Sequence, residues 1–178
     1  EFHGSIKLDL IALDTTVDGR VVFGSNTSGT YMLVYVGAEI PAGIPLFATG
    51  LGIYGIAAMA GYQMAPNKAI GTPWYAAPPT ADWYHAIEPG IANFKKWKPK
   101  AGAFAFGAGL TLGTLADNGR AFSGRFLLVC LLPGPVILLE GQANLMRPRA
   151  DLNKDPQFRA FAALDIPAGT IVFGLDAK

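Results

Sequence analysis

The chain has 178 residues, a length typical of one domain. Hydrophobic residues make up 51% of it, glycine occupies 22 positions, and only 15% of the residues are charged. This composition excludes a disordered chain, which needs low hydrophobicity, and the single cysteine excludes a disulfide scaffold. The net charge of +1 argues against electrostatic binding of nucleic acid. What remains is a chain unusually apolar and glycine-rich for a free-standing domain.

The first 40 residues predict short β-strands separated by turns. Apolar and polar residues alternate over residues 6–10, and the polar segment 25–29 separates two runs of β-branched and aromatic residues. In the second run, residues 31–36, both sets of alternating positions are apolar. This pattern indicates a strand covered on both faces.

Residues 46–62 form the centre of the longest stretch without a charge, and two structures are compatible with them. The length fits a transmembrane helix. Four glycines interrupt the stretch, each costing up to ~1 kcal/mol relative to alanine in a helix, and no basic cluster closes either end. We therefore expect a long, bent, glycine-rich strand or strand pair, buried on both faces, in preference to a membrane-spanning helix.

The character of the chain changes over residues 65–100, which contain six prolines and all three tryptophans. The prolines exclude a continuous strand or a long helix. Short helices are expected over residues 80–88 and 91–97. We interpret the segment as an ordered, partly helical insertion over a sheet, because its aromatic side chains would be costly to leave in water.

Alternation with a period of two returns after residue 101. Over residues 103–114, bulky residues alternate with alanine, glycine and threonine, so this strand has one bulky face and one nearly bare face. Asn118-Gly119 supplies the positive φ angles of a hairpin turn. The segment Pro133-Gly134-Pro135 then ends the return strand.

Two more strand segments follow, over residues 136–145 and 158–175, the second of them a hairpin. The expected fold class is therefore mainly β: an antiparallel meander or sandwich, or an open barrel-like sheet, with a Pro/Trp-rich, partly helical insertion. The expected organisation is a single domain over residues 1–178, or an excised segment of a larger protein, with the insertion at residues 65–100.

The two ends of the chain resemble each other. Ala12-Leu13-Asp14 is followed four residues later by Gly19-Arg20-Val21-Val22-Phe23-Gly24, and Ala163-Leu164-Asp165 is followed three residues later by Gly169-Thr170-Ile171-Val172-Phe173-Gly174. Each segment predicts a strand, a turn containing glycine, and a second strand. The offset between the aspartates, 165 − 14 = 151, fits two explanations. Either two ordinary hairpins match, or the chain is cut from a longer array of repeats.

Several segments together resemble a known family: residues 44–52 (IPLFATGLG), residues 107–114 (GAGLTLGT), the turn Asp117-Asn118-Gly119, and residues 132–144 (LPGPVILLEGQAN). They are similar to parts of very long, glycine-rich bacterial β-proteins that are defined only as a domain of unknown function. The resemblance covers most of the chain, and its motifs are structural. It implies that the chain is a segment of a larger β-protein, and it implies no reaction.

Few residues are suited to catalysis or metal binding. The two histidines and Cys130 have no spacing that fits zinc, and Cys130 lies in an apolar run that is typical of an inert core thiol. Gly50-x-Gly52-x-x-Gly55 matches a dinucleotide fingerprint but lacks the βαβ context. His85 and Glu88 would share a helix face as an acid–base pair, but we interpret them as surface residues. We therefore expect no enzyme, cofactor or metal site.

The aromatic insertion contains the candidate ligand- or partner-binding residues, which are Trp74, Trp83, Tyr84, His85 and Trp97. Four lysines flank Trp97, at positions 95, 96, 98 and 100. Such an arrangement can stack single-stranded nucleic acid or anchor at a membrane interface. We interpret it as a solvated loop with one fixed tryptophan, and we expect no nucleic-acid partner.

The nearly bare face of residues 103–113 guides the functional hypothesis, because a face without side chains needs another sheet, an aromatic insertion or a partner chain against it. We expect a non-catalytic structural or scaffolding β-unit of a larger or repetitive assembly. It would self-associate, or join neighbouring domains of the same long chain, through glycine-lined faces and sheet edges. An extracellular or cell-surface location fits such an assembly, but the sequence contains no signal peptide that would specify it.

Two alternatives belong to other classes of function. The first is a binding module for an apolar, lipid-like ligand, held in a β-groove with the Trp-rich insertion as a lid. The second is an outer-membrane barrel, which predicts a polar lumen face that many of the expected strands lack.

Overall fold

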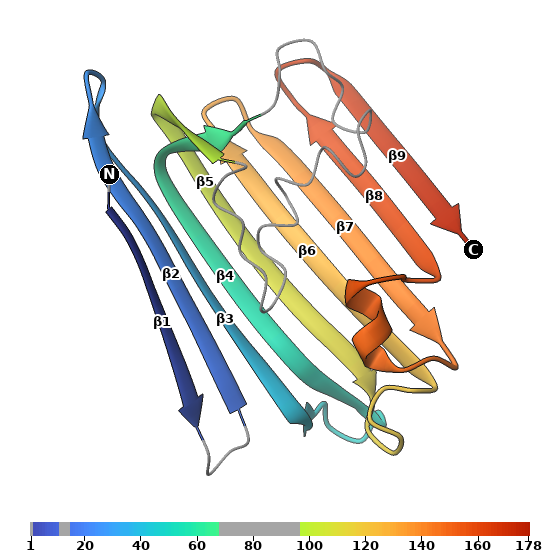
Figure 1. Cartoon of the computed structure of the whole chain (residues 1–178). Helices are drawn as coiled ribbons and strands as arrows, with labels where there is room; N and C mark the ends of the chain where they lie inside the picture. Colours follow the sequence, from blue (N-terminus) through green and yellow to red (C-terminus); the bar gives the residue numbers. More distant parts are fainter. Residues whose placement is uncertain (1, 11–14, 68–96) are drawn as a thin grey trace.

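The computed structural model describes residues 2–10, 15–67 and 97–178, which form one open, nine-stranded antiparallel sheet (Figure 1). The strands lie side by side in chain order, so the topology is an uninterrupted meander. The mainly β fold and the antiparallel meander expected from the sequence are thus confirmed. The strands are β1 (Phe2–Leu10), β2 (Thr15–Asn26), β3 (Gly29–Pro45), β4 (Leu51–Pro66), β5 (Trp97–Thr114), β6 (Phe122–Leu132), β7 (Val136–Leu145), β8 (Phe158–Asp165) and β9 (Thr170–Ala177).

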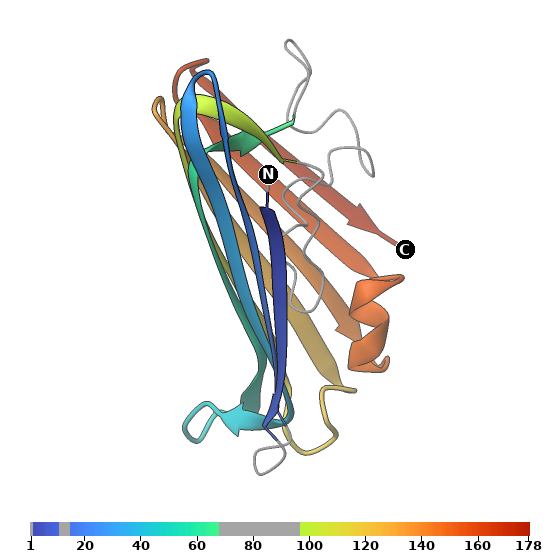
Figure 2. The same ribbon diagram turned by 60° about the vertical axis from the view of Figure 1, so that its left-hand side comes forward.

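One short 3-10 helix, η4 (Arg149–Asn153), lies in the connection between β7 and β8 and packs on one side of the sheet, against β6 and β7 (Figure 2). Leu152 from this helix is almost completely buried. The Arg149 guanidinium carbon lies 4.2 Å from the centroid of the Tyr54 ring in β4. We call the side of the sheet that contacts η4 the inner face, and the opposite side the outer face.

Several boundaries differ from those expected. Gly19 lies inside β2, paired with Ile6 of β1, and not in a turn as predicted, because β2 begins at Thr15. The expected turn with glycine is present at the other end of the chain, between Asp165 and Thr170, where Gly169 has a φ of +63°. The two similar ends therefore place their glycines differently.

The insertion is also shorter than residues 65–100. Strand β4 continues to Pro66 and β5 begins at Trp97, with these two residues paired in register. Trp97 is therefore the first residue of a strand and not the end of a helix. The other residues of the two expected helices belong to residues 68–96, which lie outside the described ranges.

The long uncharged stretch is a strand–turn–strand segment and not a helix. Residues 46–50 connect β3 to β4, where the Leu46 amide donates to the Leu51 carbonyl at 2.8 Å. Gly50 adopts a φ of +74°, which glycine reaches without the cost that a side chain would add. Among the residues that the structure describes, no helix has the length and apolar character needed to cross a membrane.

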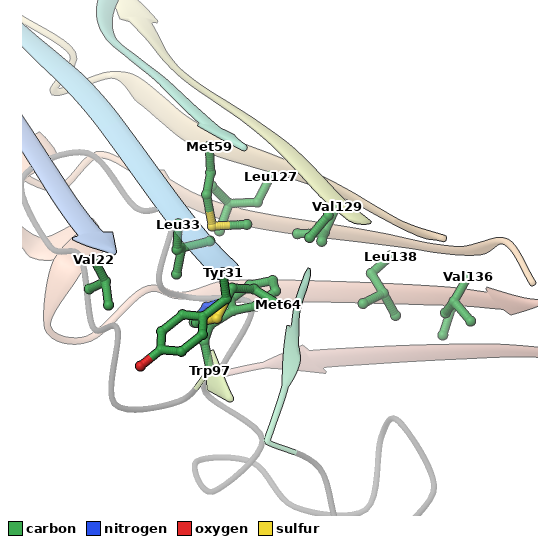
Figure 3. Packing of buried hydrophobic residues seen from close by; sticks show 12 residues of the cluster. Val22, Tyr31, Leu33, Met59, Met64, Trp97, Leu127, Val129, Val136 and Leu138 are labelled. Carbon is green, nitrogen blue, oxygen red and sulfur yellow. The ribbon is translucent and has the colours of Figure 1, made fainter. Parts of the chain in front are cut away.

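The buried core lies on the inner face. Its members come from neighbouring strands: Val22 in β2, Leu33 in β3, Met59 in β4, Val129 in β6 and Leu138 in β7 (Figure 3). Each of these side chains is at most 4% exposed. Burying side chains of this size contributes roughly 1.5–3 kcal/mol each, so this face supplies the main stabilisation of the sheet.

The small residues of β5 face inward, toward this core. Ala103 and Ala105 are buried, whereas Phe104 and Phe106 on the opposite face are 40% and 50% exposed. The space above the small residues is filled from within the chain. A Cβ on Gly61, next to Ala105 across the strand pair, would lie 3.1 Å from the Leu33 side chain. The nearly bare face is therefore already covered, and the bulky face is the one that remains exposed.

The β5–β6 connection uses the predicted Asn-Gly turn. Asn118 and Gly119 have φ angles of +56° and +79°, as a primed turn requires. The Asp117 carboxylate accepts hydrogen bonds from the Thr114 hydroxyl and from the Arg120 and Ala121 amides. These hydrogen bonds, that of Thr114 foremost, hold the pKa of Asp117 below its usual value.

Two inner-face glycines provide a matched test of the packing. In Gly113→Ala, the new Cβ would lie 3.0 Å from the Gly119 Cα and 3.2 Å from the Phe122 carbonyl oxygen, both backbone atoms that cannot turn aside. We expect a loss of about 1–3 kcal/mol in the free energy of unfolding. In Gly174→Ala, no atom lies within 4 Å of the new Cβ, and we expect the free energy of unfolding to rise by less than about 1 kcal/mol. Urea unfolding midpoints measure both, and equal midpoints would contradict this account of β5.

Candidate interaction surface

Three rows of cross-strand neighbours cross the outer face from β1 to β9, and every residue in them is apolar or glycine. Directly paired residues point to the same face of a sheet, so each row is a continuous line of side chains. Contiguous exposed apolar patches of more than a few hundred Å² are uncommon on monomeric soluble proteins. The rows are Gly4-Val21-Val34-Ala60-Phe106-Cys130-Ile137-Leu164-Ile171, Ile6-Gly19-Val36-Ala58-Ala108-Leu128-Leu139-Ala162-Phe173 and Leu8-Val17-Ala38-Ile56-Leu110-Phe126-Gly141-Ala160-Leu175.

We call these three rows the outer apolar face. Its large side chains are exposed: Phe126 is 47% exposed, Leu128 43% and Leu139 51%. Their neighbours on the same strands point the other way and are buried, as Leu127 is at 3%. The alternation in β5 is predictable from the sequence, which suggests that its small-residue face meets a partner. The outer apolar face can be recognised only from the register between neighbouring strands, because each strand contributes only a few of its residues.

A hollow of about 560 Å³ lies in the outer apolar face over β5 to β9. Small residues at Gly141, Ala160 and Ala162 leave room at its base. Large side chains border it, among them Phe126 and Phe173. A Cβ placed on Gly141 would be 3.7 Å from the Phe126 ring, an ordinary contact distance, so the base of the hollow can accept a larger residue.

The inner face carries polar side chains at one end of the core. Thr111, Arg125 and Gln142 are cross-strand neighbours on β5, β6 and β7, and all three are buried. The Arg125 Nε donates to the Thr111 Oγ1 at 3.5 Å, and the Gln142 Nε2 donates to the Glu140 Oε1 at 3.1 Å. In the described parts of the chain, no three His, Cys, Asp or Glu side chains lie close enough together to hold a metal ion.

Asn144, at the end of this polar group, anchors the β7–β8 connection, which contains η4, by hydrogen bonding. Its Oδ1 accepts a hydrogen bond from the Gln157 amide at 2.8 Å, and the Gln157 Oε1 accepts one from the Leu145 amide at 2.6 Å. The two side chains thus bridge the start and the end of the β7–β8 connection. This is a structural role for the Oδ1 of the fully buried Asn144, whereas its Nδ2 has no hydrogen-bond partner in the described structure.

Of the aromatic residues singled out from the sequence, the structure describes Trp97 alone. Trp97 is 5% exposed and belongs to the core cluster, close to Tyr31 and Met64 (Figure 3). Its ring is therefore part of the core and not of an exposed binding surface. Trp74, Trp83, Tyr84 and His85 lie outside the described residues.

Two further sequence expectations concern Cys130 and the lysines. Cys130 is partly exposed and lies on the outer apolar face, so it is not the core thiol that was expected. Lys98 and Lys100 are exposed at the start of β5, as a solvated segment requires, while Lys95, Lys96 and the His85–Glu88 pair lie outside the described residues.

The bridge made by Asn144 predicts a specific loss of stability. Asn144→Ala leaves the Gln157 amide without its acceptor, and we expect the free energy of unfolding to fall by about 1–3 kcal/mol. Ser123 is the natural control, because it is the cross-strand neighbour of Asn144, is equally buried, and its Oγ has no hydrogen-bond partner in the described structure. Ser123→Ala should change stability by less than about 0.5 kcal/mol. Equal effects in thermal unfolding would contradict the bridging role.

Comparison of the chain with protein-family models, with curated protein sequences and with solved structures finds no match. The outer apolar face is therefore the feature of the molecule from which a function can be inferred.

Proposed function

We propose that the protein is a non-catalytic structural β-unit that assembles with further units, either second copies or neighbouring domains of the same long chain, through its outer apolar face and its sheet edges. The observation that carries this proposal is the three apolar rows, which cross all nine strands without a polar residue. A soluble antiparallel sheet with one covered face normally alternates apolar residues inside with polar residues outside. Here the buried inner face mixes its apolar core with polar residues such as Arg125 and Glu140, whereas the three rows of the exposed outer face are apolar throughout.

The physical reason for assembly is the area left in contact with water. Each apolar Å² removed from water contributes roughly 25 cal/mol, and exposed patches beyond a few hundred Å² are rare on monomers. Two sheets that meet through such faces pack about 10 Å apart with interdigitated side chains. Phe106, Phe126 and Leu139, each about half exposed, are of the right type for that packing.

This proposal changes the surface that the sequence suggested. Glycine-lined faces were expected to form the contact, but the small residues of β5 already face the core. The outer apolar face takes their place in the proposal, and the sheet edges remain part of it.

The proposal predicts that a charge pair on the outer apolar face weakens assembly without unfolding the sheet. Leu128 and Leu139 are direct cross-strand neighbours, so Leu128→Lys combined with Leu139→Glu places opposite charges face to face, which is a favourable pair within the unit. Burial of the pair in an interface would be costly. We expect the dissociation constant of the assembly to rise by about tenfold or more in sedimentation equilibrium.

The matched control is Leu128→Met with Leu139→Met, which conserves volume and apolar character and should leave the assembly unchanged. Circular dichroism verifies that both variants keep their strand content. An unaltered protein that remains monomeric at high concentration would contradict the proposal, as would a charged pair that assembles as tightly as the methionine control.

A second candidate function, binding of an apolar, lipid-like ligand, is favoured by the hollow in the outer apolar face. Its volume of about 560 Å³ falls within the usual range for small-molecule sites, and its borders are aromatic and aliphatic. The lid expected from the Trp-rich insertion lies outside the described residues and adds nothing to this argument.

This second function predicts that filling the hollow displaces the ligand. Gly141→Leu extends a side chain from the base into the hollow, whereas Ala38→Leu adds similar bulk to the outer face on β3, where its neighbour on β4, Ile56, does not line the hollow. Mass spectrometry of organic extracts should find lipid with the unaltered protein and with Ala38→Leu, and much less with Gly141→Leu. Extracts of the unaltered protein that contain no lipid would eliminate this candidate.

A further inference from the structure

The strand at the end of the sheet, β9, has one side without a partner strand. Within residues 2–10, 15–67 and 97–178, β8 alone pairs with β9, and the pairing runs from Thr170 to Ala177 without a register shift. The outer-face side chains of β9 are among the most exposed large hydrophobic residues of the protein, with Phe173 at 78% and Leu175 at 79%. Exposed edges of this kind are templates for pairing with another strand.

The peptide groups at the open edge of β9 belong to the residues whose side chains lie on the outer apolar face. The Lys178 amide donates to the Gln157 carbonyl at 2.9 Å, so the peptide group of Lys178 points toward β8. Peptide groups alternate in direction along an antiparallel strand. The amides and carbonyls of Ile171, Phe173 and Leu175 therefore point away from β8, to the open edge.

β9 also lacks the features that usually protect an edge. It contains no proline, no bulge and no lysine over Thr170–Ala177, and Asp176 is its one charged residue. Eight regular residues, with their outward peptide groups available, are enough to pair with a strand of equal length.

We propose that β9 pairs antiparallel with β9 of a second copy of this chain, about a two-fold axis perpendicular to the sheet at Phe173. The inference rests on the proposed assembly function and adds a specific edge to it. Rotation about this axis turns the second copy within the plane of the sheet, so the outer apolar faces of both copies stay on the same side. The result is one continuous sheet in which the apolar rows extend across both copies.

The axis at Phe173 is favoured by the register that it creates. Phe173 then lies opposite the partner's Phe173, and Ile171 lies opposite the partner's Leu175. Both are outward-pointing, hydrogen-bonding positions, and aromatic and β-branched pairs are favourable there. On the inner face, Thr170 lies opposite the partner's Asp176. An axis at Asp176 would instead place two carboxylates opposite each other and would pair fewer residues.

The test uses the full chain carrying Leu128→Lys and Leu139→Glu, so that assembly through the outer apolar face is weakened and the edge contact is measured by itself. In this background, Phe173→Lys alone and Phe173→Glu alone place like charges opposite each other across the axis. Each should raise the dimer dissociation constant by about tenfold or more in sedimentation equilibrium. A mixture of the two variants should restore the dimer, because Lys then lies opposite Glu. The same two substitutions at exposed Phe47, in the β3–β4 connection, are the matched control and should have no effect.

A cysteine at the axis gives an independent readout. In a Cys130→Ser background, Phe173→Cys should cross-link two copies on oxidation, because hydrogen-bonded antiparallel neighbours have Cα atoms about 5.5 Å apart, within the range of a disulfide. Ile171→Cys should not cross-link, because its symmetry mate lies four residues further along the ladder.

The outcomes separate the two proposals. Absence of a dimer in the Leu128→Lys and Leu139→Glu background, together with absence of the Phe173→Cys cross-link, overturns the β9 inference, whatever the unaltered protein does. A Phe173→Cys cross-link in a protein whose assembly is insensitive to the Leu128 and Leu139 substitutions keeps the β9 inference and overturns the outer-face contact.

Discussion

The register between neighbouring strands is the constraint on which the rest of this structure depends. A shift of one residue in any pair would send every side chain of that strand to the opposite face. Here the pairing of Phe106 with Cys130, and of Cys130 with Ile137, continues through all nine strands, so short sequence patterns add up to complete faces. The core, the covered glycines and the outer apolar face all follow from that continuity.

The distribution of polarity between the two faces is unusual for a sheet that is covered on one side. The inner face contains the apolar core together with buried Arg125, Glu140 and Gln142, whereas the outer face has apolar residues where water would favour polar ones. Buried charged groups are costly unless they are hydrogen-bonded, and the contacts of Arg125 with Thr111 and of Gln142 with Glu140 meet part of that cost. This arrangement is understandable in a unit that is incomplete without a neighbour.

Local features of the fold could be predicted from the sequence, and relations between distant residues could not. Asn118-Gly119 and the alternation in β5 are encoded within a few residues, so the turn and the strand were predictable. Which face of β5 points to the core depends on Leu33 and Met59, which belong to other strands, and the alternation alone is the same in either orientation. For the same reason the sequence around Gly19 predicts a turn, since only the pairing of Gly19 with Ile6 identifies it as part of a strand. The outer apolar face could not be predicted from the sequence, because it depends on the register of every pair of neighbouring strands.

The strict chain order of the strands has a consequence for how the sheet forms. Each strand pairs only with the strands before and after it in the sequence, so every strand pair is closed by a single connection. A single hairpin such as β5–β6, with its well-defined Asn-Gly turn, can act as a nucleus from which strands are added in both directions. The β4–β5 pair is joined by the longest connection in the sheet, from Pro66 to Trp97, and the entropic cost of closing a loop grows with its length. Closure of that pair joins the two halves of the meander, β1–β4 and β5–β9, into one sheet.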